Sequence, residues 1–206
     1  MGLYENFILP QLVHCACASR LVTRERMRLV PRAQGRVLEV GMGSGLNLAH
    51  YDPARVAKVW GLEPSEGMRR KAALRLAASP VPVEWLSLPG EQIPLPDDSI
   101  DTVVLTFTLC TIPDWQTALM QIRRVLRPEG RLLFCEHGAA PDIAVRRWQD
   151  RLNPIWQRLA GGCQLNRPID QLLEQAGFRM RRLEPGYLPR TPRFAGYLYR
   201  GVAESG

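Results

Sequence analysis

The stretch Glu39-Val40-Gly41-Met42-Gly43-Ser44-Gly45 decides the fold class of this chain. It begins inside an apolar run over 36–40, which predicts a buried strand that leads directly into the glycines. Glycine permits positive φ angles and lets a ligand approach the backbone closely. We expect a helix to follow the turn and to present unpaired N–H groups to a ligand. The stretch therefore predicts a binding turn at the carboxyl edge of an α/β sheet.

Strand and helix patterns alternate on both sides of this turn, which is typical of a mainly parallel sheet. We expect one long helix over 4–30, ended by Pro31. The later elements are predicted as strands over 58–62, 83–86, 101–106 and 131–136, and helices over 66–78, 114–126, 145–159 and 168–176. Ser65 is expected to cap the helix that follows it. Two last strands, over 178–183 and 195–202, are expected to form an antiparallel hairpin at one sheet edge.

The length of 206 residues fits a single domain. Within it we expect an N-terminal helical cap over 1–34, a cofactor-binding core over 35–136, and acceptor-side helices with the hairpin over 137–206. A hydrophobic content of 46% supports a sizeable core. No apolar window is long enough for a transmembrane helix, and the N-terminus does not resemble a signal peptide. These features predict a cytoplasmic protein.

The five cysteines are odd in number and scattered, which argues against a disulfide framework and suits a reducing compartment. Cys15-Ala16-Cys17 has no second close pair and no histidine at zinc spacing, so we expect packing and no metal site. The net charge of +7 is compatible with an acidic partner, such as nucleic acid or peripheral contact with a membrane surface. The arginines are spread along the chain, however, which favours a solvated surface.

The glycine pattern distinguishes between two nucleotide cofactors. A dinucleotide fingerprint needs a glycine at the sixth position counted from Gly41, and that position is Leu46. Glu39 can receive the ammonium group of a methionine moiety, directly or through water. Glu63 ends the second predicted strand, where a carboxylate can accept hydrogen bonds from both ribose hydroxyls. The pattern therefore favours S-adenosylmethionine (SAM) over NAD.

With three further blocks, over 63–65, 90–101 and 125–131, these residues resemble the class I SAM-dependent methyltransferases with a type 11 domain. The resemblance implies a Rossmann-like, seven-stranded, mainly parallel sheet with an antiparallel last strand, helices on both faces and an N-terminal helical cap. Many relatives bind adenine with an Asp where this chain has Pro89, so Gly90 and Glu91 are expected to replace that contact. The implied SAM-binding residues are Glu39, Gly41, Gly43, Gly45, Glu63, Pro64, Gly90, Glu91 and Thr106.

The choice of methyl acceptor is expected to depend on the residues at the ends of the fourth and fifth predicted strands. Enzymes that methylate base amino groups carry an Asn/Asp-Pro-Pro-aromatic block where this chain has 106–110, so there is no clear nucleic-acid motif. Strand five ends in Glu136-His137. His137 is either a general base or a packing residue, and Glu136 either orients it or contacts the substrate. Both are our candidate catalytic residues.

A narrower resemblance links Trp148 and the segments 109–110, 136–137, 153–156 and 162–167 to the alkyl-thiol methyltransferases of animals and their soluble bacterial relatives. It implies a small, apolar methyl acceptor, with a thiol among the candidates. Two alternatives stay open: a protein or RNA methyltransferase, suggested by the charge, and a non-catalytic SAM-binding module, suggested by Pro89. A group of aromatic and apolar residues lines either an acceptor pocket or the core: Tyr4, Phe7, Leu12, Trp148 and Trp156.

Overall fold

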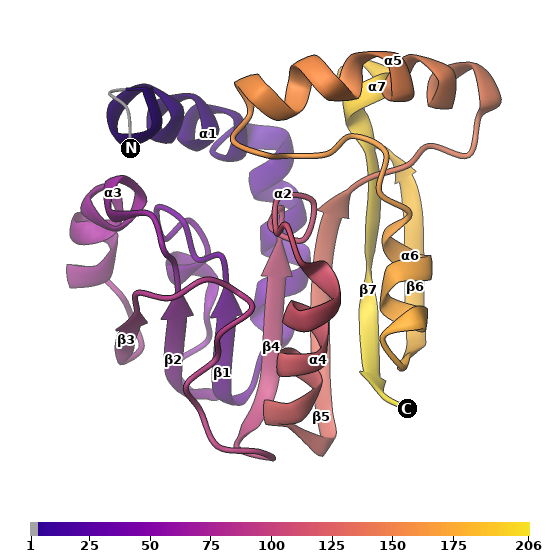
Figure 1. The fold of residues 1–206 in the computed structure, drawn as a ribbon. Helices are drawn as coiled ribbons and strands as arrows, with labels where there is room; N and C mark the ends of the chain where they lie inside the picture. The colour runs from indigo at the N-terminus through magenta and orange to yellow at the C-terminus, as the bar shows by residue number, and fades with distance from the viewer. Residues whose placement is uncertain (1–3) are drawn as a thin grey trace.

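A seven-stranded sheet runs through the computed structural model, which describes residues 4–206 (Figure 1). Its strand order is β3-β2-β1-β4-β5-β7-β6. The strands are β1 (Gly35–Val40), β2 (Val56–Leu62), β3 (Val83–Leu86), β4 (Ile100–Thr106), β5 (Leu126–His137), β6 (Phe178–Tyr187) and β7 (Tyr197–Ser205). Only β7 runs antiparallel to its neighbours, β5 and β6. The predicted mainly parallel sheet with an antiparallel last strand is confirmed.

Helices cover both faces of this sheet and its upper edge (Figure 1). They are α1 (Leu9–Cys17), α2 (Arg20–Leu29), α3 (Glu66–Ala77), α4 (Trp115–Val125), α5 (Ile143–Leu159), α6 (Ile169–Gln175) and α7 (Arg193–Gly196). Apolar residues of α4 and α6 pack into one core cluster, and the end of α2 packs into another. In Figure 1, α1 and α5 lie along the upper edge, beyond the carboxyl ends of the central parallel strands. None of the helices within residues 4–206 combines the length and the apolar composition that a membrane span requires.

The N-terminal segment is divided where we predicted one continuous helix. A π-helical turn (Tyr4–Ile8) precedes α1, and the chain leaves helical geometry at Ser19, whose φ and ψ are −57° and 148°. The Ser19 hydroxyl accepts a hydrogen bond from the N–H group of Val22 and so caps α2. The cap gives an unpaired helix donor a partner, which favours a second helix over a continuation of the first.

The expected α-helix after the glycine turn is also absent. The chain forms turns and then a short 3₁₀-helix (Leu48–His50). Only residues 46–55 separate the glycines from β2, and Pro53 stands among them. The side chains of Asn47 and Tyr51 point inward and hydrogen-bond to Glu39, which holds the segment in this compact form. Two other predictions are confirmed: Ser65 caps α3, and β6 and β7 pair as a hairpin at the far side of the sheet.

Candidate functional site

A cavity of about 290 Å³ lies at the carboxyl ends of β1, β2 and β4. The register aligns Val40 with Leu62 and with Leu105, so the residues that follow the three strands meet at one edge. Most of the predicted SAM-binding residues line the cavity, namely Gly41, Gly43, Glu63, Pro64, Gly90, Glu91 and Thr106. Glu39 and Gly45 are not part of the lining and lie behind it.

The glycine turn is fixed against the end of β2. The N–H groups of Gly41 and Met42 both donate to the carbonyl oxygen of Leu62, at 2.8 and 3.1 Å. Gly41 has a φ of +70°, which side chains disfavour. A Cβ atom there would lie 2.2 Å from Cγ2 of Thr108. Only glycine therefore lets the turn and the loop after β4 approach each other and form this cavity wall.

Glu63 follows β2 and lies in the cavity wall with 8% of its surface exposed. Its two carboxylate oxygens accept hydrogen bonds from the N–H groups of Gly43 (2.9 Å) and Ser65 (2.8 Å). Burial raises its pKa, and these two donors oppose the shift. A carboxylate has about four acceptor positions, so it keeps capacity for the hydroxyl groups of a ligand.

Glu39 is buried beneath the cavity and belongs to a polar network. Its oxygens accept hydrogen bonds from Asn47 Nδ2 (2.9 Å) and from the hydroxyl of Tyr51 (2.7 Å). Asn47 also donates to Thr106 Oγ1 at 3.0 Å. Burial raises the pKa of Glu39 to about 7, although Tyr51, the charge of Arg26 and Asn47 act in the opposite direction. Glu39 thus contacts the cavity lining through Asn47 and Thr106.

The raised pKa of Glu39 predicts a pH-dependent stability. The folded state holds this proton more tightly than the unfolded chain, so its contribution to the free energy of unfolding is complete below pH 4.5 and is lost as the pH rises to about 7. The full loss amounts to about 3 kcal/mol. Chemical denaturation at pH 5 and pH 8 should show a smaller decline in a Glu39→Gln variant than in the wild type. Equal declines in the two proteins would contradict the assignment.

Arg26 on α2 is a cavity residue that our sequence analysis did not predict. Only 5% of its surface is exposed, and its Nη1 atom donates to Asn47 Oδ1 (2.8 Å) and Thr106 Oγ1 (2.9 Å). Its Nε atom is the one buried side-chain nitrogen or oxygen of the described residues without a hydrogen-bond partner. An unpaired buried donor on a charged group is costly, and an anionic ligand in the cavity would satisfy it.

Another wall of the cavity is formed by residues 89–91 and the loop that follows β4. Pro89, Gly90 and Glu91 line the cavity beside the loop that follows β4. One oxygen of Glu91 accepts a hydrogen bond from the N–H group of Asp114 at 3.3 Å. A Cβ atom on Gly90 would lie 3.0 Å from Ile112, so this wall is closely packed. The residues that we predicted to adjoin the adenine thus lie together in one wall of the cavity.

The other end of the cavity is mainly apolar and is built from α1, the loop after β4 and the end of α5. Its lining residues are Leu9, Pro10, Val13, Cys17, Phe107, Thr108, Thr111, Ala160 and Gly161. His14 Nδ1 lies 2.7 Å from Ser44 Oγ and joins α1 to the glycine turn. Among the described residues, no histidine lines the cavity.

The aromatic and apolar residues that we considered as pocket lining lie elsewhere. Phe7, Leu12 and Trp148 are each more than half exposed. The hydroxyl of Tyr4 donates to the carbonyl oxygen of Leu159, at 2.5 Å. Trp156 donates its indole N–H to Cys163 Sγ at 3.3 Å. Helix α1 does cover the cavity, but the side chains that line it are those of Leu9 and Val13. Leu12 of the same helix faces solvent.

Glu136 and His137 end β5 outside the cavity lining. Glu136 is fully buried, and its oxygens accept hydrogen bonds from the N–H groups of Thr108 (2.8 Å) and Cys110 (3.4 Å). His137 Nε2 lies 3.0 Å from Cys163 Sγ. Burial lowers the pKa of His137, but the hydrogen bond to Cys163 and the charges of Cys163 and Glu136 together raise it overall. The catalytic roles of Glu136 and His137 stay predictions.

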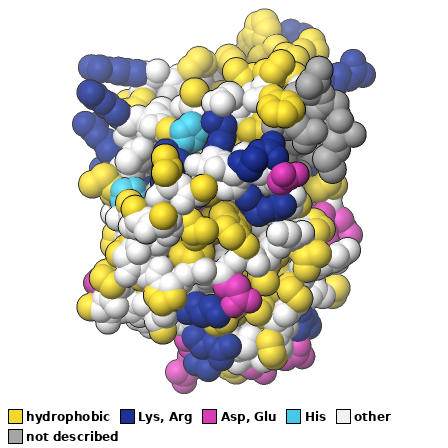
Figure 2. Space-filling model, turned by 90° about the vertical axis from the view of Figure 1, so that its left-hand side faces the viewer, with side chains coloured by type: hydrophobic (Ala, Val, Ile, Leu, Met, Phe, Trp, Pro, Cys, Tyr) yellow, Lys and Arg dark blue, Asp and Glu magenta, His cyan; other side chains and the backbone are white. Residues whose placement is uncertain are grey.

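Basic side chains do not form a single surface patch on the face shown in Figure 2. Lysine and arginine side chains lie there in several separate groups, with apolar and acidic side chains between them. A nucleic-acid interface typically concentrates positive charge along one continuous surface. This face therefore gives no support to an RNA acceptor.

Comparisons with known proteins show that this chain is similar to methyltransferases. A family described as "Methyltransferase domain" matches residues 38–134. Human thiol S-methyltransferase TMT1B is 35% identical over 175 residues, which cover 80% of this chain and 71% of the relative. Human thiol S-methyltransferase TMT1A is 32% identical over 176 residues, which cover 81% and 71%. A SAM-dependent methyltransferase structure from Leishmania major has a TM-score of 0.70 at 16% identity, covering 98% of this chain and 80% of that one, which shows a shared fold.

Proposed function

This chain belongs to the class I SAM-dependent methyltransferases, and from that premise we propose that it methylates the sulfur of a small, apolar thiol. SAM, when bound, supplies a methyl group on a sulfonium for in-line displacement. The observation that carries the proposal is the acceptor end of the cavity, which is mainly apolar and has no histidine in its described lining. The two human relatives carry thiol S-methyltransferase names, which agrees with this acceptor class.

The residues of the cavity fit SAM by their donors and acceptors. Gly41 lets the glycine turn lie against Thr108 and so form the cavity wall, and Glu63 retains acceptor positions for the ribose hydroxyls. Arg26 has an unpaired buried Nε donor for the carboxylate of the methionine moiety. Glu39 would support the methionine end through Asn47 and Thr106, and Gly90 and Glu91 would adjoin the adenine.

The chemistry of the acceptor end favours sulfur over oxygen or nitrogen. A hydroxyl or ammonium group must lose a tightly held proton before it attacks, so it needs a positioned base. A thiol has a pKa near 8.5, and its thiolate is already present in part at neutral pH and is strongly nucleophilic. An apolar wall from Phe107, Val13 and Leu9 can hold such an acceptor and exclude water. The protein then has to position the thiolate and need not ionise it.

This account predicts a pH dependence that follows the acceptor. At saturating SAM, the rate should rise with pH up to the pKa of the thiol itself. An aromatic thiol of low pKa and an aliphatic thiol of high pKa should give midpoints that differ by the difference between their pKa values. The measurement is the initial rate of thioether formation from each thiol between pH 6 and pH 10. A midpoint common to both thiols would indicate a base on the enzyme and would contradict this account.

Because Arg26 is proposed to bind the carboxylate of SAM, its replacement should weaken the binding only of ligands that contain this carboxylate. An Arg26→Met variant should bind SAM about 10- to 100-fold more weakly, because a hydrogen bond to a charged group contributes about 1.5–3 kcal/mol. Binding of methylthioadenosine, which lacks the methionine carboxylate, should change little. Isothermal titration of both ligands tests this contrast, with Arg24→Met, on the exposed side of the same helix, as the matched control. Equal losses for the two ligands would argue for a general structural role of Arg26.

A further inference from the structure

A cluster of three metal-binding side chains lies behind the acceptor end of the cavity. Cys110 follows β4, His137 ends β5, and Cys163 lies between α5 and α6. Their ligand atoms all lie within 4.8 Å of one another. Cys163 Sγ is 3.0 Å from His137 Nε2 and 3.8 Å from Cys110 Sγ. Cys110 is buried and the other two residues are half-buried, so the cluster is largely shielded from solvent.

These distances resemble those of a tetrahedral zinc centre. With Zn–S bonds of ~2.3 Å and Zn–N bonds of ~2.0 Å, two sulfur ligands lie about 3.8 Å apart and a sulfur and a nitrogen about 3.5 Å apart. The separation of Cys110 Sγ and Cys163 Sγ already has this value. The His137–Cys163 pair would have to open by about half an ångström. That adjustment is small for side chains on three different segments.

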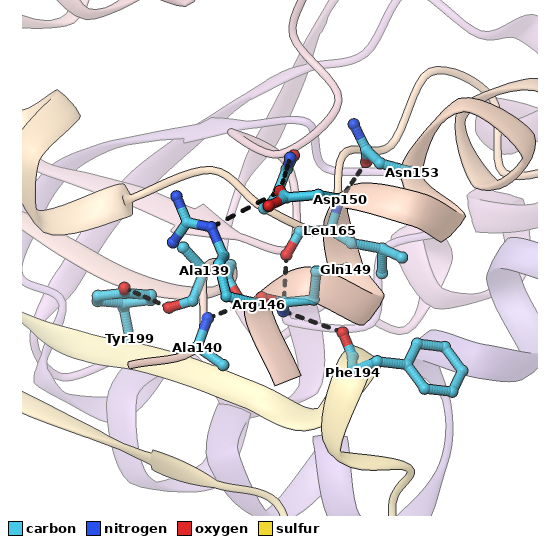
Figure 3. A network of polar contacts seen from close by, with 11 residues as sticks. Ala139, Ala140, Arg146, Gln149, Asp150, Asn153, Leu165, Phe194 and Tyr199 are labelled. Atoms are coloured by element: carbon cyan, nitrogen blue, oxygen red, sulfur yellow. Dashed lines mark hydrogen bonds and ion pairs between the residues drawn. The ribbon is translucent and has the colours of Figure 1, made fainter. Parts of the chain in front are cut away.

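The buried side chain of Gln149 fixes the segments that carry two of the three ligands. Gln149 on α5 accepts a hydrogen bond from the N–H group of Ala140 and donates to the carbonyl oxygens of Gly138 and Leu165. Figure 3 shows Gln149 at the centre of these contacts, between the segments that follow His137 and Cys163. Both segments are thus fixed to the same buried side chain.

Two polar groups beside the cluster suit a metal-bound thiolate. The indole N–H of Trp156 donates to Cys163 Sγ, and such donors around a ligand sulfur tune and orient metal sites. The guanidinium of Arg167 is buried nearby, where it donates to the carbonyl oxygens of Leu109 and Ile112, on both sides of Cys110. Its positive charge offsets negative charge that develops on the two sulfurs.

We propose that Cys110, His137 and Cys163 form a binding site for a soft divalent cation, with Zn²⁺ as the ion that the donor set favours. Two thiolates and an imidazole are ligands that Zn²⁺ prefers, and three protein ligands leave the fourth position to a water molecule. Binding releases one proton from each thiol to solvent, and no oxidant or reductant takes part. The site is independent of which acceptor the enzyme methylates.

Bound Zn²⁺ would tie together the segments that shape the acceptor end. Cys110 lies between the cavity-lining residues Thr108 and Thr111, and Cys163 is two residues beyond Gly161, which also lines the cavity. Sequence spacing does not reveal the site, because Cys163 is 26 residues from His137 and 53 from Cys110. The ion would therefore raise thermal stability and order the cavity wall.

Zinc binding is tested with the whole protein, reduced and freed of metal by a chelator. Equilibrium dialysis against Zn²⁺ should give a single bound ion per chain, with a rise in Tm that Mg²⁺ does not produce. Co²⁺ should give the intense near-ultraviolet bands of thiolate-to-metal charge transfer. Cys163→Ser and His137→Gln should each weaken Zn²⁺ binding by at least about 10-fold.

The matched control is Cys135→Ala, since Cys135 is a buried cysteine of β5 outside the cluster. It should bind Zn²⁺ like the wild type. Circular dichroism and SAM binding establish that the cluster variants are folded. The proposal is overturned if folded Cys163→Ser binds Zn²⁺ as tightly as the wild type, or if the Co²⁺ complex lacks thiolate bands. It is also overturned if the folded, reduced protein binds no Zn²⁺.

Discussion

A Gly41→Ala substitution is expected to abolish measurable SAM binding and to lower the stability of the fold. The residue has a φ of +70°, and an added Cβ would lie 2.2 Å from Thr108 Cγ2. Thr108 cannot withdraw easily, because its N–H group donates to buried Glu136 and its hydroxyl to the carbonyl oxygen of Gly41. The strain should cost about 2–4 kcal/mol of unfolding free energy and displace the turn from the cavity. Calorimetric titration with SAM and thermal unfolding measure both effects.

Gly186→Ala is the control for the general effect of adding a methyl group. Gly186 lies in the edge strand β6, and its added Cβ would have no neighbour closer than 3.7 Å. This variant should bind SAM like the wild type and unfold at nearly the same temperature. Normal SAM binding by Gly41→Ala would show that the turn does not form the cofactor site in the way described.

Removal of the Glu63 carboxylate is expected to have the second-largest effect. Glu63→Ala should weaken SAM binding by about 100-fold, because the ribose would lose its acceptors and the N–H groups of Gly43 and Ser65 would lose their partner. Methylthioadenosine contains the same ribose, so its binding should weaken in parallel. This result would differ from that for Arg26→Met, whose effect should be confined to ligands that have the carboxylate. Calorimetry with both ligands gives the comparison.

Glu66→Gln is the matched control, since Glu66 is an exposed carboxylate three residues further along the chain and, within the described part of the chain, pairs only with Arg70. It should leave both affinities unchanged. A Glu63→Ala variant that binds SAM within about 2-fold of the wild type would remove Glu63 from the proposed ribose contact.

Much of the cofactor side of the cavity could be predicted from the sequence because its signals are local. Gly41, Gly43 and Glu63 each follow a recognisable buried strand, and parallel strands bring such residues to one edge. Ser65 precedes a helical pattern and caps it, as its residue type predicts. Contacts within a few residues of the chain, combined with strand order, are sufficient for these assignments.

The remaining features depend on contacts between distant segments. Arg26 reaches the cavity from α2 only because it hydrogen-bonds to Asn47 and Thr106, and nothing in its local sequence indicates that position. The turn after Gly45 forms no α-helix because Asn47 and Tyr51 bond to Glu39. The break at Ser19 was detectable, since serine favours helix starts, but the apolar pattern continues across it.

Contacts between distant segments also limit what the sequence predicts about the acceptor side of the cavity. We selected His137 for its place at the end of a strand, and the structure confirms that place. Its contact with Cys163, which comes from a different part of the chain, could not be inferred from periodicity. The lining by Leu9 and Val13 likewise depends on how α1 crosses the sheet edge, whereas Leu12 on the same helix faces solvent.

The most direct test of the central claim is methyl transfer from isotopically labelled SAM to matched acceptors. Each set would contain a thiol, an alcohol and an amine on the same apolar group, and products would be identified by mass spectrometry. We predict labelled methyl thioether from the thiol, little or no product from the alcohol and the amine, and no thioether with the Glu63→Ala variant at the same SAM concentration. Transfer to the amine or alcohol in preference to the thiol, or no transfer by protein that binds SAM, would contradict the account.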